Sequence, residues 1–236
     1  MFFFDFMLVL FTLPAVLLAM FAQYRVSSAY REMSQIRARM SGFHAARKIL
    51  DDAGLYNVNI EQIPGQMSDH YDPRQKVLRL SPDVYQGYSM AAVGIAAHEA
   101  GHALQDALHY VPLKVRNMAV PVASIGSNFG MLAIMIGFSL LFSGIALGKT
   151  VLLLGILLFA AVVLFQLINL PVEFNASSRA KTELLKLGII TGPELPYVSK
   201  VLNAAALTYV AATLHSVLTL AYYLMRYASA TSNSRS

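Results

Sequence analysis

Four apolar stretches divide this sequence, and each is long enough for a helix that crosses a bilayer, which needs roughly 20 apolar residues. They cover about 2–23, 118–147, 151–170 and 204–225. The composition agrees with a lipid environment, because 56% of the residues are hydrophobic and only 13% are charged. The sequence therefore predicts a mainly α, polytopic membrane protein with about four transmembrane helices.

These stretches define six segments of the chain. We expect an anchor helix at 1–24, a polar segment at 25–117, a transmembrane hairpin at 118–170, a second polar segment at 171–203, a transmembrane helix at 204–225 and a disordered tail at 226–236. Of the 18 Lys and Arg residues, 15 lie in the two polar segments. Basic residues favour the cytoplasmic side, so both polar segments are expected there, at the inner membrane. Because these residues flank apolar runs, their expected partner is anionic lipid and not nucleic acid.

The first polar segment has the pattern of a small α+β domain. Helical periodicity covers 34–53 and 89–108, and turn-prone residues separate two β-like runs at 56–63 and 77–80. A small hairpin is the simplest interpretation of the two runs. The strand at 76–81 would then either offer a free edge to an extended peptide or simply pack on the helix.

The helix at 89–108 contains His98-Glu99-Ala100-Gly101-His102, which has the pattern of a zinc site. Residues four apart share a helix face, so His98 and His102 can place imidazole nitrogens on one ion. Glu99 points about 100° away from His98, where its carboxylate can act as the catalytic base on a zinc-bound water. The chain has no cysteine, so a metal must be held by nitrogen and oxygen ligands.

The same five residues can also occur by chance in a helix without any metal, with the histidines exposed or hydrogen-bonded in a core. The residues on both sides of this motif, however, are small and apolar, over 91–97 and at Ala103 and Leu104. This composition predicts a helix that is packed on several sides. Buried imidazoles and a buried carboxylate require polar partners, and a metal ion supplies them.

A third protein ligand must come from outside the motif helix. Asp106 is eight residues beyond His98, about 12 Å along a helix, which is too far to share one ion. His109 lies about 10.5 Å beyond His102 and is excluded for the same reason. Glu173 follows the third apolar stretch, where an unpaired acid is costly, and it shares a helical face with three small residues. The expected topology puts Glu173 on the same side as the histidines, so we predict that it is the third ligand.

The motif and the later run Glu-Phe-Asn-Ala-Ser-Ser-Arg-Ala at 173–180 resemble the YugP-type neutral zinc metallopeptidases of bacterial membranes. The similarity covers nearly the whole chain, including Ala-Leu-Thr-Tyr-Val-Ala-Ala at 206–212. The chain is more distantly similar to HtpX-type membrane proteases and CAAX prenyl proteases, in which a Glu-x-x-x-Asp motif supplies a ligand and an acid that braces a histidine. Ser177 stands in place of that acid. The brace is then weaker, or Asn175 or another group supplies it.

The residues and the resemblance together predict a zinc endopeptidase with a small, zincin-like α+β cytoplasmic part. One zinc ion per chain would be held by His98, His102 and Glu173 at the cytoplasmic membrane surface. The expected partners are the lipid bilayer and protein or peptide substrates, above all membrane and membrane-proximal proteins. A homo-oligomer or a membrane partner protein is compatible with the sequence.

Zinc-dependent amide hydrolysis passes through an oxyanion, so a hydrogen-bond donor is expected near the metal. Tyr209, in the run that matches the family, and His215, in the fourth apolar stretch, are the candidate catalytic residues for this role. A single hydrogen bond to a neighbouring helix would satisfy His215 equally well.

Two other functions fit parts of the sequence. A closed fourth coordination position would favour a non-catalytic membrane scaffold or adaptor stabilised by zinc, but only three good ligands are visible and Glu99 would have no purpose. A transporter or channel fits the Gly-rich second span, but it would need polar residues along the spans. Few occur there apart from Asn128, Gln166 and His215.

Overall fold

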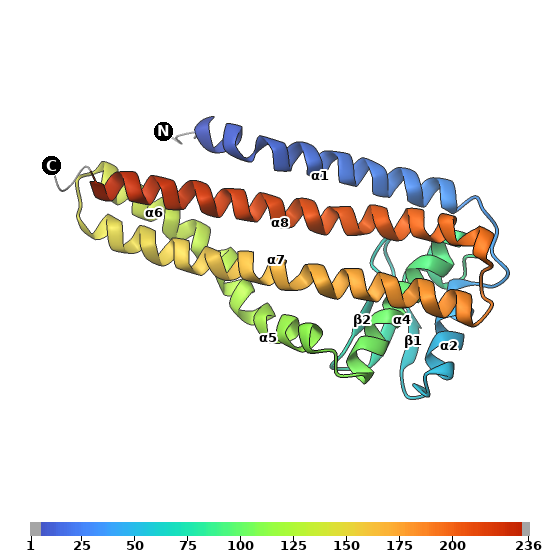
Figure 1. Ribbon diagram of the computed structural model, residues 1–236. Helices are drawn as coiled ribbons and strands as arrows, with labels where there is room; N and C mark the ends of the chain where they lie inside the picture. Colours follow the sequence, from blue (N-terminus) through green and yellow to red (C-terminus); the bar gives the residue numbers. More distant parts are fainter. Residues whose placement is uncertain (1–5, 233–236) are drawn as a thin grey trace. The chain divides into compact units, whose positions relative to one another are not determined.

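A computed structural model describes residues 6–232 of the chain, and Figure 1 shows its elements. The helices are α1 (Phe6–Met33), α2 (Gly42–Asp52), α3 (Pro82–Tyr85), α4 (Met90–Ala107), α5 (Val111–Ile125), the π-helix η1 (Gly126–Gly130), α6 (Met131–Phe142), α7 (Leu147–Lys186), the 3-10 helix η2 (Gly192–Glu194) and α8 (Leu195–Ser232). The strands are β1 (Asn59–Gln62), β2 (His70–Asp72) and β3 (Val77–Leu80).

The chain forms two compact units. The first unit contains the described residues of Met1–Met20 and Tyr209–Ser236, together with Val115–Leu170. The second unit contains Phe21–Lys114 and Pro171–Thr208. The predicted metal ligands and both polar segments, apart from residues 115–117, therefore fall in the second unit.

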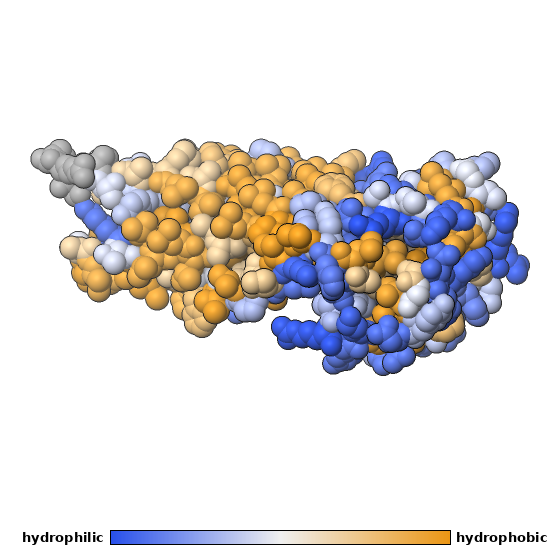
Figure 2. Space-filling model, turned by 60° about the horizontal axis from the view of Figure 1, so that its bottom comes forward, coloured by the Kyte–Doolittle hydropathy of each residue, from blue (hydrophilic) through white to orange (hydrophobic). Residues whose placement is uncertain are grey.

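Four helical stretches among the described residues are long and apolar enough to cross a membrane. They are Phe6–Met33, Val111–Phe142, Leu147–Lys186 and Gly192–Thr231. On the face that Figure 2 presents, hydrophobic side chains cover the first unit and hydrophilic side chains gather over the second. The predicted fold class, mainly α with about four membrane helices and a small α+β part, is confirmed.

Several helices continue beyond the apolar stretches that predicted them. α7 runs past residue 170 to Lys186, and α8 begins at Leu195, before the predicted start at 204. The tail predicted to be disordered over 226–236 is helical up to Ser232, because neither Gly nor Pro interrupts α8 there. Residues 233–236 of that tail and residues 1–5 of the predicted anchor lie outside the described residues.

Helices α6 and α7 approach each other closely in the first unit because glycines lie at their contact. A Cβ atom added at Gly137 would lie 2.5 Å from the backbone nitrogen of Leu152, and one at Gly155 would lie 2.6 Å from that of Ile134. Ile134 and Leu152 are buried in one cluster with Tyr222 of α8. Small residues let membrane helices pack in close van der Waals contact. Packing thus accounts for the glycines at this contact.

In the second unit, helix α4 contacts α2, α3, β2 and β3. The helix predicted over 34–53 begins only at Gly42, where the hydroxyl of Ser41 caps its first turn. Ile49 and Leu50 of α2 are fully buried in the same core as Leu78 and Leu80 of β3. This core supports the helix that carries the histidine motif.

The predicted hairpin between 56–63 and 77–80 is wrong. The sheet order is β1-β3-β2, with β1 parallel and β2 antiparallel to β3. β3 forms its hairpin with β2, whose residues lie in a stretch predicted to be a turn. The chain between β1 and β3 makes the crossover that a parallel pair requires. β3 is paired on both sides, so of the two alternatives for the strand at 76–81 the free peptide-binding edge is excluded.

Candidate metal centre

Helix α4 presents both motif histidines on one face. The hydroxyl of Ser89 accepts a hydrogen bond from the backbone nitrogen of Ala92 at 3.1 Å, which caps the helix, and alanine-rich sequence favours its continuation. His98 and His102 lie one turn apart, with ring centroids separated by 4.8 Å. One turn of helix therefore supplies two imidazoles side by side.

Glu173 of α7 completes a group of three predicted ligands. Its Oε2 atom lies 3.2 Å from Nε2 of His98 and 3.6 Å from Nε2 of His102. In a tetrahedral zinc site with bonds of about 2.0–2.1 Å, neighbouring ligand atoms are about 3.3–3.4 Å apart, so both distances fit. Glu173 is 4% exposed, and His102 is 7% exposed. Within the described residues, these three side chains form a group that could hold one metal ion.

Gly101 allows α4 and α7 to approach closely enough for this geometry. A Cβ atom added at Gly101 would lie 2.6 Å from the backbone oxygen of Ala176, a distance that real Cβ atoms essentially never show. Ala176 and Ala180, on the same face of α7, are both buried. The close approach predicted from the small residues of both helices is confirmed.

The variant Gly101→Ala should therefore lower both thermal stability and zinc affinity. Alanine favours the helix by about 1 kcal/mol relative to glycine. Its methyl group, however, would overlap the backbone of α7 at Ala176, which costs roughly 1–3 kcal/mol and would push His98 and His102 away from Glu173. Gly94→Ala in the same helix is the control, since its Cβ would lie 3.1 Å from a side-chain methyl of Val198 that can adjust. Equal Tm values and zinc affinities for the two variants would contradict this explanation.

Glu99 adjoins the group of ligands without belonging to it. Its side chain is buried, and burial raises the pKa of Glu99 to about 7, while the charge of His98 opposes that rise. A carboxylate with a pKa near neutral is suited to take and return a proton. The role of Glu99 as catalytic base stays a prediction that this environment supports.

Each histidine has a hydrogen-bonding partner on the ring nitrogen that faces away from Glu173. The hydroxyl of Ser177 lies 3.1 Å from Nδ1 of His98, so Ser177 takes the position that the sequence indicated for a brace. Oε1 of Gln105 lies 2.9 Å from Nδ1 of His102. Gln105 was not among the residues predicted from the sequence. The available signal was its spacing, three residues after His102 on the same helix face.

The two nearby residues that spacing excluded are outside the group of ligands. Asp106 accepts a hydrogen bond from the hydroxyl of Tyr71 at 2.9 Å and lies 3.9 Å from Nζ of Lys76. His109 follows the end of α4 with a positive φ of 54° and is exposed. Asp106 thus fastens β2 to α4 and is not directed at the histidines.

Tyr209 and His215 both lie on α8 in the first unit, whereas the predicted ligands lie in the second unit. The side chain of His215 is exposed, and that of Tyr209 is partly buried. Neither residue belongs to the group that could hold a metal. Their part in stabilising an oxyanion stays a prediction.

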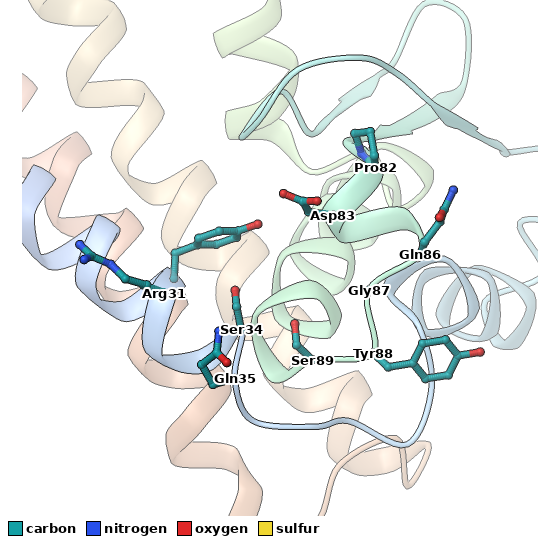
Figure 3. A pocket seen from close by; sticks show the side chains of 10 residues that line it. Arg31, Ser34, Gln35, Pro82, Asp83, Gln86, Gly87, Tyr88 and Ser89 are labelled. Carbon is teal, nitrogen blue, oxygen red and sulfur yellow. The ribbon is translucent and has the colours of Figure 1, made fainter.

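A polar pocket of about 560 Å³ lies elsewhere in the second unit. Figure 3 shows that Asp83 of α3 lines it together with Ser34, just after α1, and Ser89, just before α4. None of its lining residues belongs to the group of ligands. The pocket is therefore a feature distinct from the metal centre.

Four membrane-length helices and a group of two histidines and one glutamate, of which His102 and Glu173 are buried, show the class of protein. The chain is a polytopic membrane protein with the ligand set that zinc metallopeptidases use. It belongs to the family described as "Putative neutral zinc metallopeptidase", whose sequence profile matches residues 8–228.

The chain is also similar to a curated bacterial protein. It is 45% identical over 217 residues to "Putative membrane protease YugP" of Bacillus subtilis (strain 168), an alignment that covers 91% of this chain and 93% of that protein. No solved structure matches the chain significantly. The family resemblance inferred from the motifs is confirmed.

Proposed function

We propose that this chain is a membrane-embedded zinc endopeptidase that hydrolyses peptide bonds in membrane or membrane-proximal proteins. The proposal rests on the group of His98, His102 and Glu173, and on Glu99, which follows His98 directly on the same helix. A bound zinc ion would act as a Lewis acid toward a substrate carbonyl and would make water a nucleophile at neutral pH. The family description and the membrane protease similarity support this reading.

The chain's own residues would divide the work of hydrolysis. His98, His102 and Glu173 would hold one ion and leave one position of a tetrahedral site open, as catalytic zinc sites do. Glu99 would take a proton from the attacking water and deliver it to the nitrogen of the leaving amine. Because Glu99 is buried, its carboxylate would exchange protons with these reactants and not freely with bulk water.

The position of the third ligand suggests where substrates bind. Glu173 lies on α7 only three residues beyond the apolar stretch that ends at residue 170, so the site should lie at a membrane surface. Membrane proteins and chain segments close to the bilayer are the substrates with access to such a site. The distribution of Lys and Arg favours the cytoplasmic surface of the inner membrane.

The zinc-stabilised scaffold remains the rival function. A scaffold does not require the buried carboxylate of Glu99 next to His98, whereas a peptidase requires a general base at this position. The deciding test compares cleavage of casein, a loosely folded substrate, by the wild-type protein and by Glu99→Gln at equal zinc content. A scaffold predicts no cleavage by either protein.

The cytoplasmic placement of the site can be tested by thiol labelling, because the chain has no cysteine of its own. Gln66→Cys reports on the exposed loop before β2, and Ser143→Cys is the matched control in the exposed α6–α7 connection. In intact cells, a membrane-impermeant maleimide should label Ser143→Cys and spare Gln66→Cys, which should react only after permeabilisation. The reverse pattern would place the metal centre on the outer face.

A further inference from the structure

Gln105 joins the motif helix to α7 through a fully satisfied side chain. It is 0% exposed, and its Oε1 atom lies 2.9 Å from Nδ1 of His102. Its Nε2 atom donates to the backbone oxygen of Val172 at 2.8 Å and to Oδ1 of Asn175 at 3.0 Å. Both amide protons and the amide oxygen of Gln105 are therefore engaged.

These contacts leave Gln105 one orientation. The backbone oxygen of Val172 can only accept, so the amide nitrogen of Gln105 must face it and the amide oxygen must face His102. An oxygen acceptor requires that Nδ1 of His102 carries the proton. In the neutral imidazole the lone pair then lies on Nε2, the nitrogen that is 3.6 Å from Glu173 and is the one that must bind a metal.

Arg179 fixes the second acceptor of Gln105. Its Nε atom donates to Oδ1 of Asn175 at 2.7 Å, and a guanidinium has no acceptor atom and stays charged. Asn175 must therefore present its oxygen, and not its NH₂ group, to both Arg179 and Gln105. Ser177 does not fix the tautomer of His98 in this way, because its hydroxyl can either donate to Nδ1 or accept from it.

We propose that Gln105 is a positioning residue that fixes the tautomer and ring orientation of His102 for metal binding, with Asn175 and Arg179 holding its amide in place. This inference rests on the proposed role of His102 as a ligand. Partners that orient a ligating histidine are worth about 10–100-fold in metal affinity. The network thus supplies, with neutral amides, the support that a carboxylate gives in other zinc sites.

The first test replaces Gln105 by methionine in the full-length protein in detergent. Gln105→Met keeps the size of the side chain but removes the acceptor, so zinc affinity in a chelator competition should fall about 10–100-fold. In the metal-free protein, the ring nitrogen NMR shifts of His102 should change from one tautomer to a mixture. The chain has six histidines, so these signals can be assigned by single substitutions.

Gln86→Met is the matched control, because the amide of Gln86 is exposed and contacts Gln62, away from the ligands. It should change neither measurement. Unchanged zinc affinity in Gln105→Met, or a loss of affinity without any change of tautomer, would overturn the proposal. A wild-type protein that binds no zinc would refute the proposed function, while the NMR shifts would still report the tautomer separately.

The second test uses the sign of a charge effect. If only electrostatics mattered, Arg179→Met would raise zinc affinity, because it removes a positive charge near a bound cation. The network predicts the opposite: the variant should bind zinc roughly two- to tenfold more weakly, the effect of losing one hydrogen bond. Adding Asn175→Asp should restore most of the loss, because a carboxylate can only accept from Gln105. A rise in affinity, or no restoration, would remove Arg179 and Asn175 from the proposal.

Discussion

Replacing Glu99 by glutamine should abolish peptide cleavage while the protein keeps one zinc ion per chain. A positioned general base typically contributes about 10²–10⁴-fold to the rate, and the carboxylate within the group, Glu173, is assigned to the metal and not to proton transfer. Glutamine has nearly the same shape and carries no charge to bury. Since burial already raises the pKa of Glu99 to about 7, the variant should fold at least as stably as the wild type.

The measurement pairs zinc content by metal analysis with the initial rate of casein cleavage, and Tm reports folding. Glu61→Gln is the matched control, because this exposed carboxylate of β1 pairs only with Arg79 at 3.3 Å in a surface contact. It should cleave at the wild-type rate. Wild-type cleavage by zinc-loaded Glu99→Gln would eliminate the proposed mechanism, and loss of zinc in that variant would mean that Glu99 holds the metal.

The sequence was most informative where the geometry is local. His98 and His102 are four residues apart on a helix, so their juxtaposition follows from helix geometry alone. Length and hydropathy likewise predicted four membrane-length helices. These features need no knowledge of which distant segments meet.

Glu173 shows that physical constraints can identify a distant residue of the site without knowing which segments meet. It is 75 positions from His98, but three constraints pointed to it: the cost of an acid near a membrane, the small residues on its face and the shared side of the membrane. Gly101 provided a matching signal on the other helix. The structure brings Glu173 within 3.6 Å of both histidines.

The sheet and the amide network depended on pairings that no local pattern encodes. The short strand β2 looked like a turn, and only its pairing with β3 reveals a strand. Gln105 was visible at helical spacing from His102, but its purpose depends on a backbone oxygen of α7. Backbone acceptors are identical at every residue, so sequence cannot indicate which one a buried amide will reach.

Removing Glu173, the predicted third ligand, should abolish high-affinity zinc binding, which makes Glu173→Ala the other change with a very large expected effect. The variant leaves two imidazoles from one helix, and two protein ligands cannot complete a zinc site that needs three. Zinc affinity should fall by much more than the 10–100-fold expected when a supporting hydrogen bond is lost. Glu173→Gln should bind almost as poorly, because it keeps the shape but lacks the charged oxygen, and this separates ligation from packing.

Asp106→Ala is the control for an acid on the motif helix itself. It loses the hydrogen bond from Tyr71 and some stability, but it should keep one zinc ion per chain and wild-type affinity. Zinc should raise the Tm of the wild type and of Asp106→Ala, since a ligand that binds the folded state stabilises it, and should leave the Tm of Glu173→Ala unchanged. If Glu173→Ala kept wild-type zinc affinity, the third ligand would have to be sought elsewhere. The close approach of α7 to the motif helix would then serve packing alone.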